Sequence, residues 1–229
     1  MTPIAHIRSA FPEKFGIPRQ SGLVPELRAR IVFEPEFRNP DALRGLEDFS
    51  HIWLIWQFSA AVRRNWFPTV RPPRLGGNTR IGVFATRSPF RPNAIGLSSV
   101  RLEQVALHTA DGPVLYVSGA DLMNGTPIYD IKPYIPADCH PEATSGFVGQ
   151  HAWETLTVHI PPELLSRVPA EHRNGLLGVL EQDPRPSYQD DPTRVYGMSF
   201  AGCNVSFTVS KHTLTVINIE TAKENSSRS

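Results

Sequence analysis

The sequence predicts a mainly β protein, in which an N-terminal antiparallel β-barrel is followed by a small C-terminal α+β domain. The first 140 residues contain five or six strand-like segments and one clear helix, which a closed barrel or strongly curved sheet can bury. The chain has 22 prolines in 229 residues, where an average protein has about 5%. Proline favours strands, turns and fixed loops over long helices. After the segment PADCHPEATSG the pattern changes to helices followed by strands.

The first strand and helix of the predicted barrel lie between residues 27 and 46. Residues 27–37 (LRARIVFEPEF) alternate apolar and polar side chains, as a half-buried strand does. Asn39 then offers a cap and Pro40 a first helical turn, so a short helix with Leu43 and Leu46 on its apolar face is expected.

The remaining barrel elements follow from apolar runs and turn signals. Residues 50–59 (SHIWLIWQFS) read as a strand covered on both faces, and residues 63–78 as a loop rich in arginine, proline and glycine. Residues 79–88 alternate through Ile81, Val83 and Ala85. Residues 97–122 predict two strands joined by a hairpin turn at residues 110–112, and residues 125–134 predict another strand.

The C-terminal part is predicted to be a separate unit. We place the barrel at residues 1–140, a linker at about 138–148 and the small α+β domain at residues 149–229. Residues 161–168 and 169–183 have helical patterns, and residues 197–220 predict two strands around a turn at Lys211 and His212.

Composition and missing motifs exclude several function classes. The net charge of +1 gives no global field, so a polyanion would have to meet a local patch. Two separate cysteines, Cys139 and Cys203, and the absence of a signal-like start predict a cytoplasmic protein. No apolar run approaches the roughly 20 residues that span a bilayer, so no membrane partner is expected. The sequence has no GxGxxG, Walker, HExxH, CxxC or GxSxG motif, and we expect no metal; His51 is interpreted as an interior histidine.

The segment TRSPFRPNAIGLSSVRL, residues 86–102, predicts a rigid cationic corner. Pro89 and Pro92 hold the preceding residues extended, so Arg87 and Arg91 are fixed at low entropic cost. Fixed guanidinium groups suit phosphate, carboxylate or stacked rings, and Gly96 permits a close approach or a tight bend. These features indicate an anion or nucleotide site without specifying a reaction.

Two further polar clusters lie near predicted strand ends. In YDIKPY, Asp130, Lys132 and Tyr134 are two residues apart and share one face of an extended chain; the alternative is an exposed face with a local ion pair. In GADLMNGTP, Asp121 and Asn124 precede Gly125. They could hold an amine or ribose hydroxyls, or they could cap a turn.

Four segments of the chain, taken in order, resemble the TrmO (TsaA-like) family of tRNA methyltransferases. They are FSHIWLIWQF, RIGVFATRSPFRPNAIGLSSVRLEQV, LYVSGADLMNGTPIYDIKPYIP and DPRPSY. The resemblance covers most of the chain and both proposed domains. It implies an S-adenosylmethionine-dependent enzyme that methylates N6 of N6-threonylcarbamoyladenosine at position 37 of tRNA. It also implies a β-barrel fold and a homodimer with cofactor pockets near the subunit contact.

The resemblance also implies a set of cofactor-binding residues. These are Pro18, Arg19, Gln20, Ser59, Ala60, Arg87, Leu97, Asp121, Leu122, Met123 and Asn124. Two departures from the family pattern stand out. Relatives commonly have a histidine followed by a polar residue at the positions of Ser59 and Ala60, so contacts there could come from the backbone. The family's DGT reads Asn124, Gly125 and Thr126 here, which leaves Asp121 as the expected acidic partner of the cofactor.

The reaction requires the acceptor nitrogen to lose a proton. Asp130 and Tyr134 are the candidate bases, and Lys132 could offset substrate charge. Candidate tRNA contacts are basic residues beside Trp66 and Phe67 or in other loops, suited to phosphate neutralisation and base stacking; a solvated loop is the alternative. They are Arg63, Arg64, Arg71, Arg74, Arg91 and Arg185. Two other functions stay open on the same barrel, a small-molecule methyltransferase or hydrolase and a non-catalytic nucleotide sensor.

Overall fold

The structure is a computed structural model. The residues that it describes are 1–62, 65–72, 75, 78–149, 154–185 and 191–222. Within these ranges no helix is long and apolar enough to cross a membrane.

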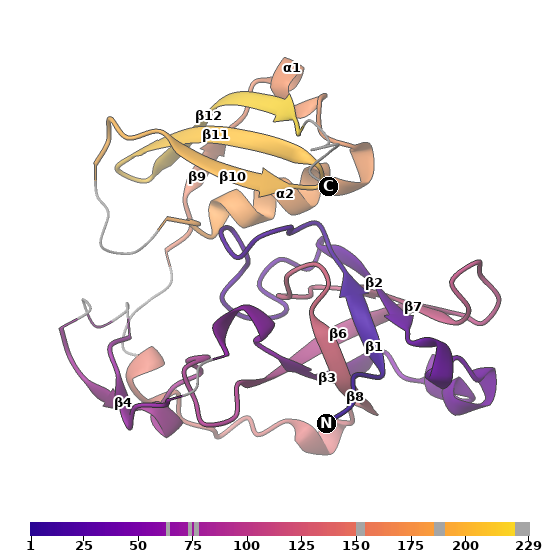
Figure 1. Ribbon diagram of the computed structural model, residues 1–229. Coiled ribbons are helices and arrows are strands. Elements are labelled where there is room, and N and C mark those ends of the chain that lie inside the picture. Colours follow the sequence, from indigo (N-terminus) through magenta and orange to yellow (C-terminus); the bar gives the residue numbers. More distant parts are fainter. Residues whose placement is uncertain (63–64, 73–74, 76–77, 150–153, 186–190, 223–229) are drawn as a thin grey trace.

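Six antiparallel strands close into a barrel, which confirms the predicted fold class (Figure 1). Around the barrel the order is β1, β2, β7, β6, β3, β8, and β8 returns to pair with β1. The bounds are β1 Ala5–Arg8, β2 Arg28–Phe33, β3 His51–Gln57, β6 Ile95–Ala106, β7 Val114–Ser118 and β8 Pro127–Pro133. A separate two-stranded sheet pairs β4 (Thr69–Val70) with β5 (Ile81–Gly82).

Alternating side chains fill the barrel interior, as a period of two requires. On β2 the buried side chains are Ala29, Ile31 and Phe33, in agreement with the predicted strand. On β3 only one face is fully buried, by Ile52, Leu54 and Trp56, while the outer face is half-exposed. The prediction that this strand is covered on both faces is therefore wrong, because a barrel wall has one packed side.

Three local predictions need correction. His51 is exposed rather than interior, because it is the first residue of β3 and its Nδ1 lies 2.9 Å from Ser50 Oγ at the barrel edge. The predicted single helix after Asn39 is two 3-10 turns, Pro40–Leu43 and Leu46–Asp48, since Gly45 between them is left-handed with φ +83°. The Asn39 cap itself is present, accepting a bond from the Asp41 N–H at 3.0 Å.

The alternation at residues 79–88 gives only the two-residue strand β5, followed by a 3-10 turn. Strand β1 was not predicted, because its four residues form a strand only between the partners β2 and β8. The β6–β7 hairpin was predicted correctly, with Gly112 left-handed at φ +79° in its turn. Further 3-10 helices are Pro35–Phe37, Ser59–Ala61, Val83–Ala85, Pro136–Asp138, Gly146–Val148 and Ala170–His172.

A four-stranded sheet and two helices make up the C-terminal part. The sheet order is β10, β11, β12, β9, and the β12–β9 pair is parallel. The bounds are β9 Thr157–His159, α1 Pro162–Leu165, α2 Arg173–Glu181, β10 Tyr196–Phe200, β11 Cys203–Ser210 and β12 Thr213–Thr221. The predicted turn at Lys211 joins β11 to β12. A second turn at Ala201 and Gly202 separates β10 from β11, so residues 197–220 hold three strands rather than two.

The chain between β1 and β2, residues 9–27, lies between the barrel and the C-terminal sheet (Figure 1). Its buried residues Ala10, Phe11, Val24 and Leu27 belong to the same apolar core as the C-terminal strands, not to the barrel core. We call residues 9–27 the β1–β2 connection.

Candidate functional site

A cavity of about 850 Å³ opens where the β1–β2 connection meets β3, β6 and the loop before β6. Its described lining combines aromatic and apolar side chains with four cations and a single carboxylate. The lining residues are Lys14, Ile17, Pro18, Arg19, Gln20, Ser21, Trp53, Trp56, Gln57, Phe58, Ser59, Ala60, Ala61, Thr86, Arg87, Pro89, Arg91, Ile95, Gly96, Leu97, Ser99, Asp121, Met123 and Thr126. A mainly apolar cavity with a few convergent polar groups is the usual form of a small-molecule site.

Trp56 forms the floor of this cavity because the residue facing it is a glycine. Trp56 on β3 is paired with Gly96 on β6, and a Cβ atom at position 96 would lie 2.3–2.7 Å from the indole ring. The ring also packs against Phe58, with centroids 4.3 Å apart. The close approach that Gly96 was predicted to permit is therefore made by a tryptophan of the same chain.

A short hydrogen-bonded chain leads from Trp56 to the carboxylate. The indole N–H of Trp56 donates to Ser98 Oγ at 3.0 Å, and the Ser98 hydroxyl donates to Asp121 Oδ1 at 2.6 Å. Ser98 is almost fully buried inside the barrel. Since a serine hydroxyl has one proton to donate, accepting from Trp56 directs that proton toward Asp121.

Burial raises the pKa of Asp121 above its ordinary value. Four contacts oppose this shift by favouring the carboxylate: the Ser98 hydroxyl, the backbone N–H groups of Asp121 and Ser21, and the positive charge of Arg87. Among the described lining residues Asp121 is the one acid, facing Lys14, Arg19, Arg87 and Arg91. The cavity can therefore hold both a cationic and an anionic group of one ligand.

Nine of the eleven residues predicted to bind a cofactor line this cavity. The two others lie elsewhere. Leu122 is buried in the barrel core, and Asn124 Oδ1 accepts a bond from the Ser9 N–H at 3.2 Å. Because side chains alternate along an extended chain, Asp121 and Met123 face the cavity while Leu122 faces the barrel interior.

Arg91 lines the cavity but is held by its own loop. Its guanidinium donates to the Thr86 carbonyl at 2.6 Å and lies 5.7 Å from the Phe84 ring centroid. These contacts brace the loop that carries Arg87. The two arginines of the rigid corner therefore differ. Arg91 is bonded to its own loop, whereas the positive charge of Arg87 favours the ionised form of Asp121.

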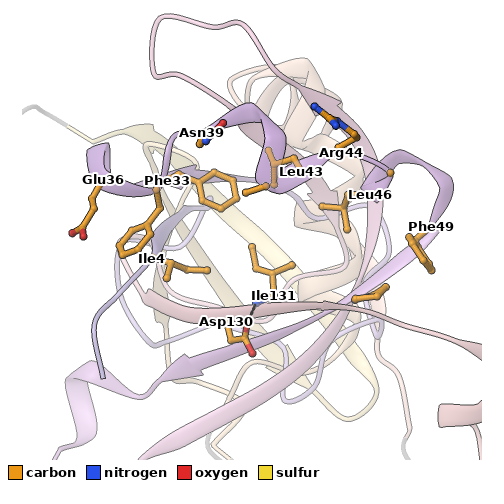
Figure 2. Close-up of a pocket in the computed structure, with 14 residues that line it drawn as sticks. Ile4, Phe33, Glu36, Asn39, Leu43, Arg44, Leu46, Phe49, Asp130 and Ile131 are labelled. Carbon is orange, nitrogen blue, oxygen red and sulfur yellow. Dashed lines mark hydrogen bonds between the residues drawn. The ribbon is translucent and has the colours of Figure 1, made fainter.

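The predicted catalytic cluster lies apart from this cavity. Asp130 lines a second pocket of about 500 Å³, under the 3-10 turns that follow β2 (Figure 2), and pairs with Lys132 at 2.9 Å. Tyr134 packs against Trp53, with ring centroids 5.3 Å apart, and Trp53 does line the large cavity. The structure therefore brings Tyr134, but not Asp130, next to a residue of the cofactor-sized cavity.

Three of the six arginines predicted to contact RNA lie within the described residues, namely Arg71, Arg91 and Arg185. Arg63, Arg64 and Arg74 lie outside the described residues, and Arg71 is exposed. Arg185 makes a bidentate pair with Asp183, at 2.9 Å for both bonds, and its side chain is 11% exposed. That arrangement leaves little of its guanidinium surface for an RNA phosphate.

Sequence reasoning missed Lys14, Trp56 and Ser98. A serine at an inward position of a strand gives a weak signal, although Ser98 falls where the alternation of β6 places a core residue. Among the described residues no group of three or more His, Cys, Asp or Glu side chains could hold a metal ion.

Family models and relatives match the chain over nearly its whole length. The model for the tRNA-methyltransferase O N-terminal domain matches residues 6–139, and the TrmO C-terminal domain model matches residues 154–222. The tRNA (adenine(37)-N6)-methyltransferase of Escherichia coli (strain K12) is 40% identical over 226 residues, which cover 95% of this chain and 96% of that protein. A putative S-adenosylmethionine-dependent methyltransferase, RcsF, of Pseudomonas aeruginosa is 42% identical over 206 residues, covering 86% and 87% of the two chains.

The fold agrees with these matches. A crystal structure of TrmO from Pseudomonas aeruginosa superposes with a TM-score of 0.73 at 36% identity, and the superposition covers 96% of each chain. Three findings agree. Two family models together span most of the sequence, a relative is 40% identical over nearly all of it, and the fold is the same. The chain belongs to the tRNA-methyltransferase O (TrmO) family.

Proposed function

We propose that the protein transfers a methyl group from S-adenosylmethionine to N6 of adenosine 37 in tRNA, with N6-threonylcarbamoyladenosine as the acceptor. The observation that carries the proposal is the large cavity in which one partly buried carboxylate, Asp121, faces a set of cations beside the Trp56 ring. The matched relatives bear the names of tRNA (adenine(37)-N6)-methyltransferases.

The lining residues fit the chemistry of the cofactor. S-adenosylmethionine carries an ammonium, a carboxylate, ribose hydroxyls and an adenine ring. Asp121 can accept bonds from the ammonium or the hydroxyls, Arg19 and Arg87 can pair with the carboxylate, and apolar side chains such as Leu97 can cover the adenine. The bound cofactor supplies an electrophilic methyl group on its sulfonium.

The chain contributes positioning more than covalent chemistry. Methyl transfer is an in-line displacement, so holding the acceptor nitrogen at about 3–3.5 Å from the methyl carbon supplies much of the rate. The proton acceptor stays a prediction. Tyr134 packs against the cavity residue Trp53, whereas Asp130 is paired with Lys132 over the second pocket. Tyr134→Phe and Asp130→Asn, assayed with saturating cofactor, would each retain full turnover if the residue has no part in proton removal.

The charge distribution along the sequence supports an RNA partner. Residues 49–102 contain eight arginines and no Asp or Glu, although the whole chain has a net charge of only +1. This segment includes the loop before β4, the β4–β5 sheet and the loop that carries Arg87. A segment rich in arginines that also carries the exposed rings of Trp66 and Phe67 suits the phosphates and unstacked bases of an anticodon loop.

We further propose that a second copy of the chain covers the apolar rim of the cavity. Val62, Phe67, Phe84 and Leu97 are 58%, 61%, 70% and 58% exposed. Leu97 lines the cavity, Val62 directly follows the lining residue Ala61, and the Phe84 ring lies against the lining residue Arg91. Large exposed apolar surfaces mark interaction sites. The aliphatic side chains of Val62 and Leu97 have no ring that could stack on a nucleobase. Sedimentation of wild type and Leu97→Glu tests this: a dimer that dissociates in the variant supports it. A monomeric wild type contradicts it and leaves Phe67 and Phe84 for base stacking.

Binding and transfer experiments test the function itself. Calorimetry measures S-adenosylmethionine binding, and transfer of a labelled methyl group is followed on tRNA with and without the threonylcarbamoyl group. We expect transfer to the modified tRNA only. Binding without transfer to any RNA would indicate a nucleotide sensor, and transfer to small molecules alone would indicate the small-molecule enzyme. Since Cys139 and Cys203 are both free thiols, a cytoplasmic location is part of the proposal.

A further inference from the structure

We infer that the C-terminal sheet and α2 pack behind the β1–β2 connection, which forms one wall of the cofactor cavity, and hold this connection in its binding conformation. The inference rests on the proposed function, since it assigns the C-terminal part a role in cofactor affinity. It goes beyond a role in tRNA binding, which would leave cofactor affinity untouched.

One side of the β1–β2 connection belongs to the cavity. Its lining residues are Lys14, Ile17, Pro18, Arg19, Gln20 and Ser21. None of these residues lies in a helix or strand, so no regular hydrogen-bond ladder fixes their backbone. Segments with few internal bonds open at low free energy unless neighbouring structure holds them.

The other side packs against β10. The rings of Phe11 and Phe200 make an edge-to-face contact with centroids 5.3 Å apart, and the Ala201 N–H donates to the Ala10 carbonyl at 2.8 Å. Ile17 belongs to both sides, because it lines the cavity and also packs against the C-terminal core. The connection is thus a single layer of chain between cavity and sheet.

The closest contact is between Gly16 and Met198. Gly16 is left-handed at φ +88°, and a Cβ atom there would lie 2.1 Å from the Met198 sulfur. Met198 is buried, so its thioether fills the space directly behind the residues that lead into Pro18 and Arg19. At the far end of the connection α2 also approaches closely, since a Cβ on Gly178 would stand 2.6 Å from Val24.

The connection also reaches the carboxylate of the site. The Ser21 N–H is one of the donors to Asp121, and the neighbouring Gly22 N–H donates to the Gly119 carbonyl at 2.9 Å. A shift of the connection away from β10 would therefore move a donor to Asp121 as well as the cationic lining residues. Because interiors are close-packed, loss of side-chain volume behind the connection is felt by the residues in front of it.

Met198→Ala in the full-length protein tests the inference. We expect the Kd and KM for S-adenosylmethionine to rise about 2- to 30-fold, the range for residues that couple sites without touching ligand. The kcat at saturating cofactor and the KM for tRNA should stay unchanged. Met198→Leu, which keeps the volume, should restore cofactor affinity. Hydrogen exchange at residues 14–21 should be faster in Met198→Ala.

The matched control is Leu214→Ala. Leu214 is as buried as Met198 and lies in the same core, but on β12, paired with Val158 of β9 at the sheet edge away from β10. The Leu214→Ala substitution should reduce the stability of the protein without changing its affinity for S-adenosylmethionine. The inference is overturned, and the proposed function is not, if both variants weaken cofactor binding equally. The same holds if Met198→Ala weakens tRNA binding and leaves cofactor affinity unchanged. A wild-type protein that binds no S-adenosylmethionine overturns the proposed function with it.

Discussion

The indole ring of Trp56 lies so close to the backbone of Gly96 that a Cβ on Gly96 would stand 2.3 Å from ring atom Cε2. Trp56 is buried, and its N–H is bonded to Ser98, so a displacement of the ring would disturb that bond. A glycine is therefore required at a strand position where, by backbone conformation alone, any residue would be accepted.

Gly96→Ala should displace the ring and disturb the cavity floor. Overpacking a buried site typically costs about 1–3 kcal/mol, and the Trp56–Ser98 bond would be strained or lost. We expect a lower melting temperature and weaker S-adenosylmethionine binding, measured by calorimetry. Gly82→Ala is the matched control, because nothing lies within 4 Å of a Cβ there. Unchanged cofactor affinity in Gly96→Ala would mean that the cofactor does not depend on the Trp56 floor.

Ser98→Ala should make cofactor binding more sensitive to acid. The Ser98 hydroxyl favours the ionised form of Asp121, so its removal raises the pKa of that carboxyl further. If the cofactor requires the carboxylate, affinity falls as pH falls through the Asp121 pKa, and the variant should lose affinity at a higher pH than wild type. Ser98→Thr keeps the hydroxyl donor, so its pH profile should match that of wild type, while its added methyl group lowers stability at this buried position. Identical pH profiles for wild type and Ser98→Ala would rule out this role.

Asp121→Asn should separate stability from function. Because burial raises the pKa of Asp121, the folded state binds the proton more tightly than the unfolded state does. The free energy of unfolding therefore decreases as pH rises from the ordinary carboxyl pKa through the raised one. At neutral pH the neutral amide should thus raise the melting temperature while cofactor affinity falls. A melting temperature that drops at neutral pH would show that the carboxylate stabilises the fold.

Arg71→Gln should weaken tRNA binding through phosphate contacts. Arg71 is exposed within the acid-free segment 49–102. The slope of log affinity against log salt should decrease by about 1, as for one lost phosphate contact. Arg44→Gln is the control, since Arg44 lies beside the second pocket and pairs with Asp41. Equal slopes for wild type and Arg71→Gln would place the tRNA elsewhere.

Local sequence patterns were sufficient where an element or turn carries its own signal. The alternation of β2 marked Ala29, Ile31 and Phe33 as buried, and the turn signal before Gly112 located the β6–β7 hairpin. Elements and turns without such a local signal were missed. Four-residue β1 is a strand because Phe33 and Ile128 lie beside it, and β10 is separated from β11 by a turn in which the non-glycine Ala201 adopts a positive φ.

By itself the sequence determined the mainly β class and the alternation that fills the barrel, and its resemblance to a known family implied nine residues of the cavity. Only the tertiary structure decided that Trp56 and Ser98 meet Asp121, that Asp130 faces a different pocket, and that residues 9–27 rest on the C-terminal sheet. The reason is physical. Periodicity states which side of an element is apolar, but which elements meet is settled by long-range strand pairing and close packing, to which residues far apart in the chain contribute together.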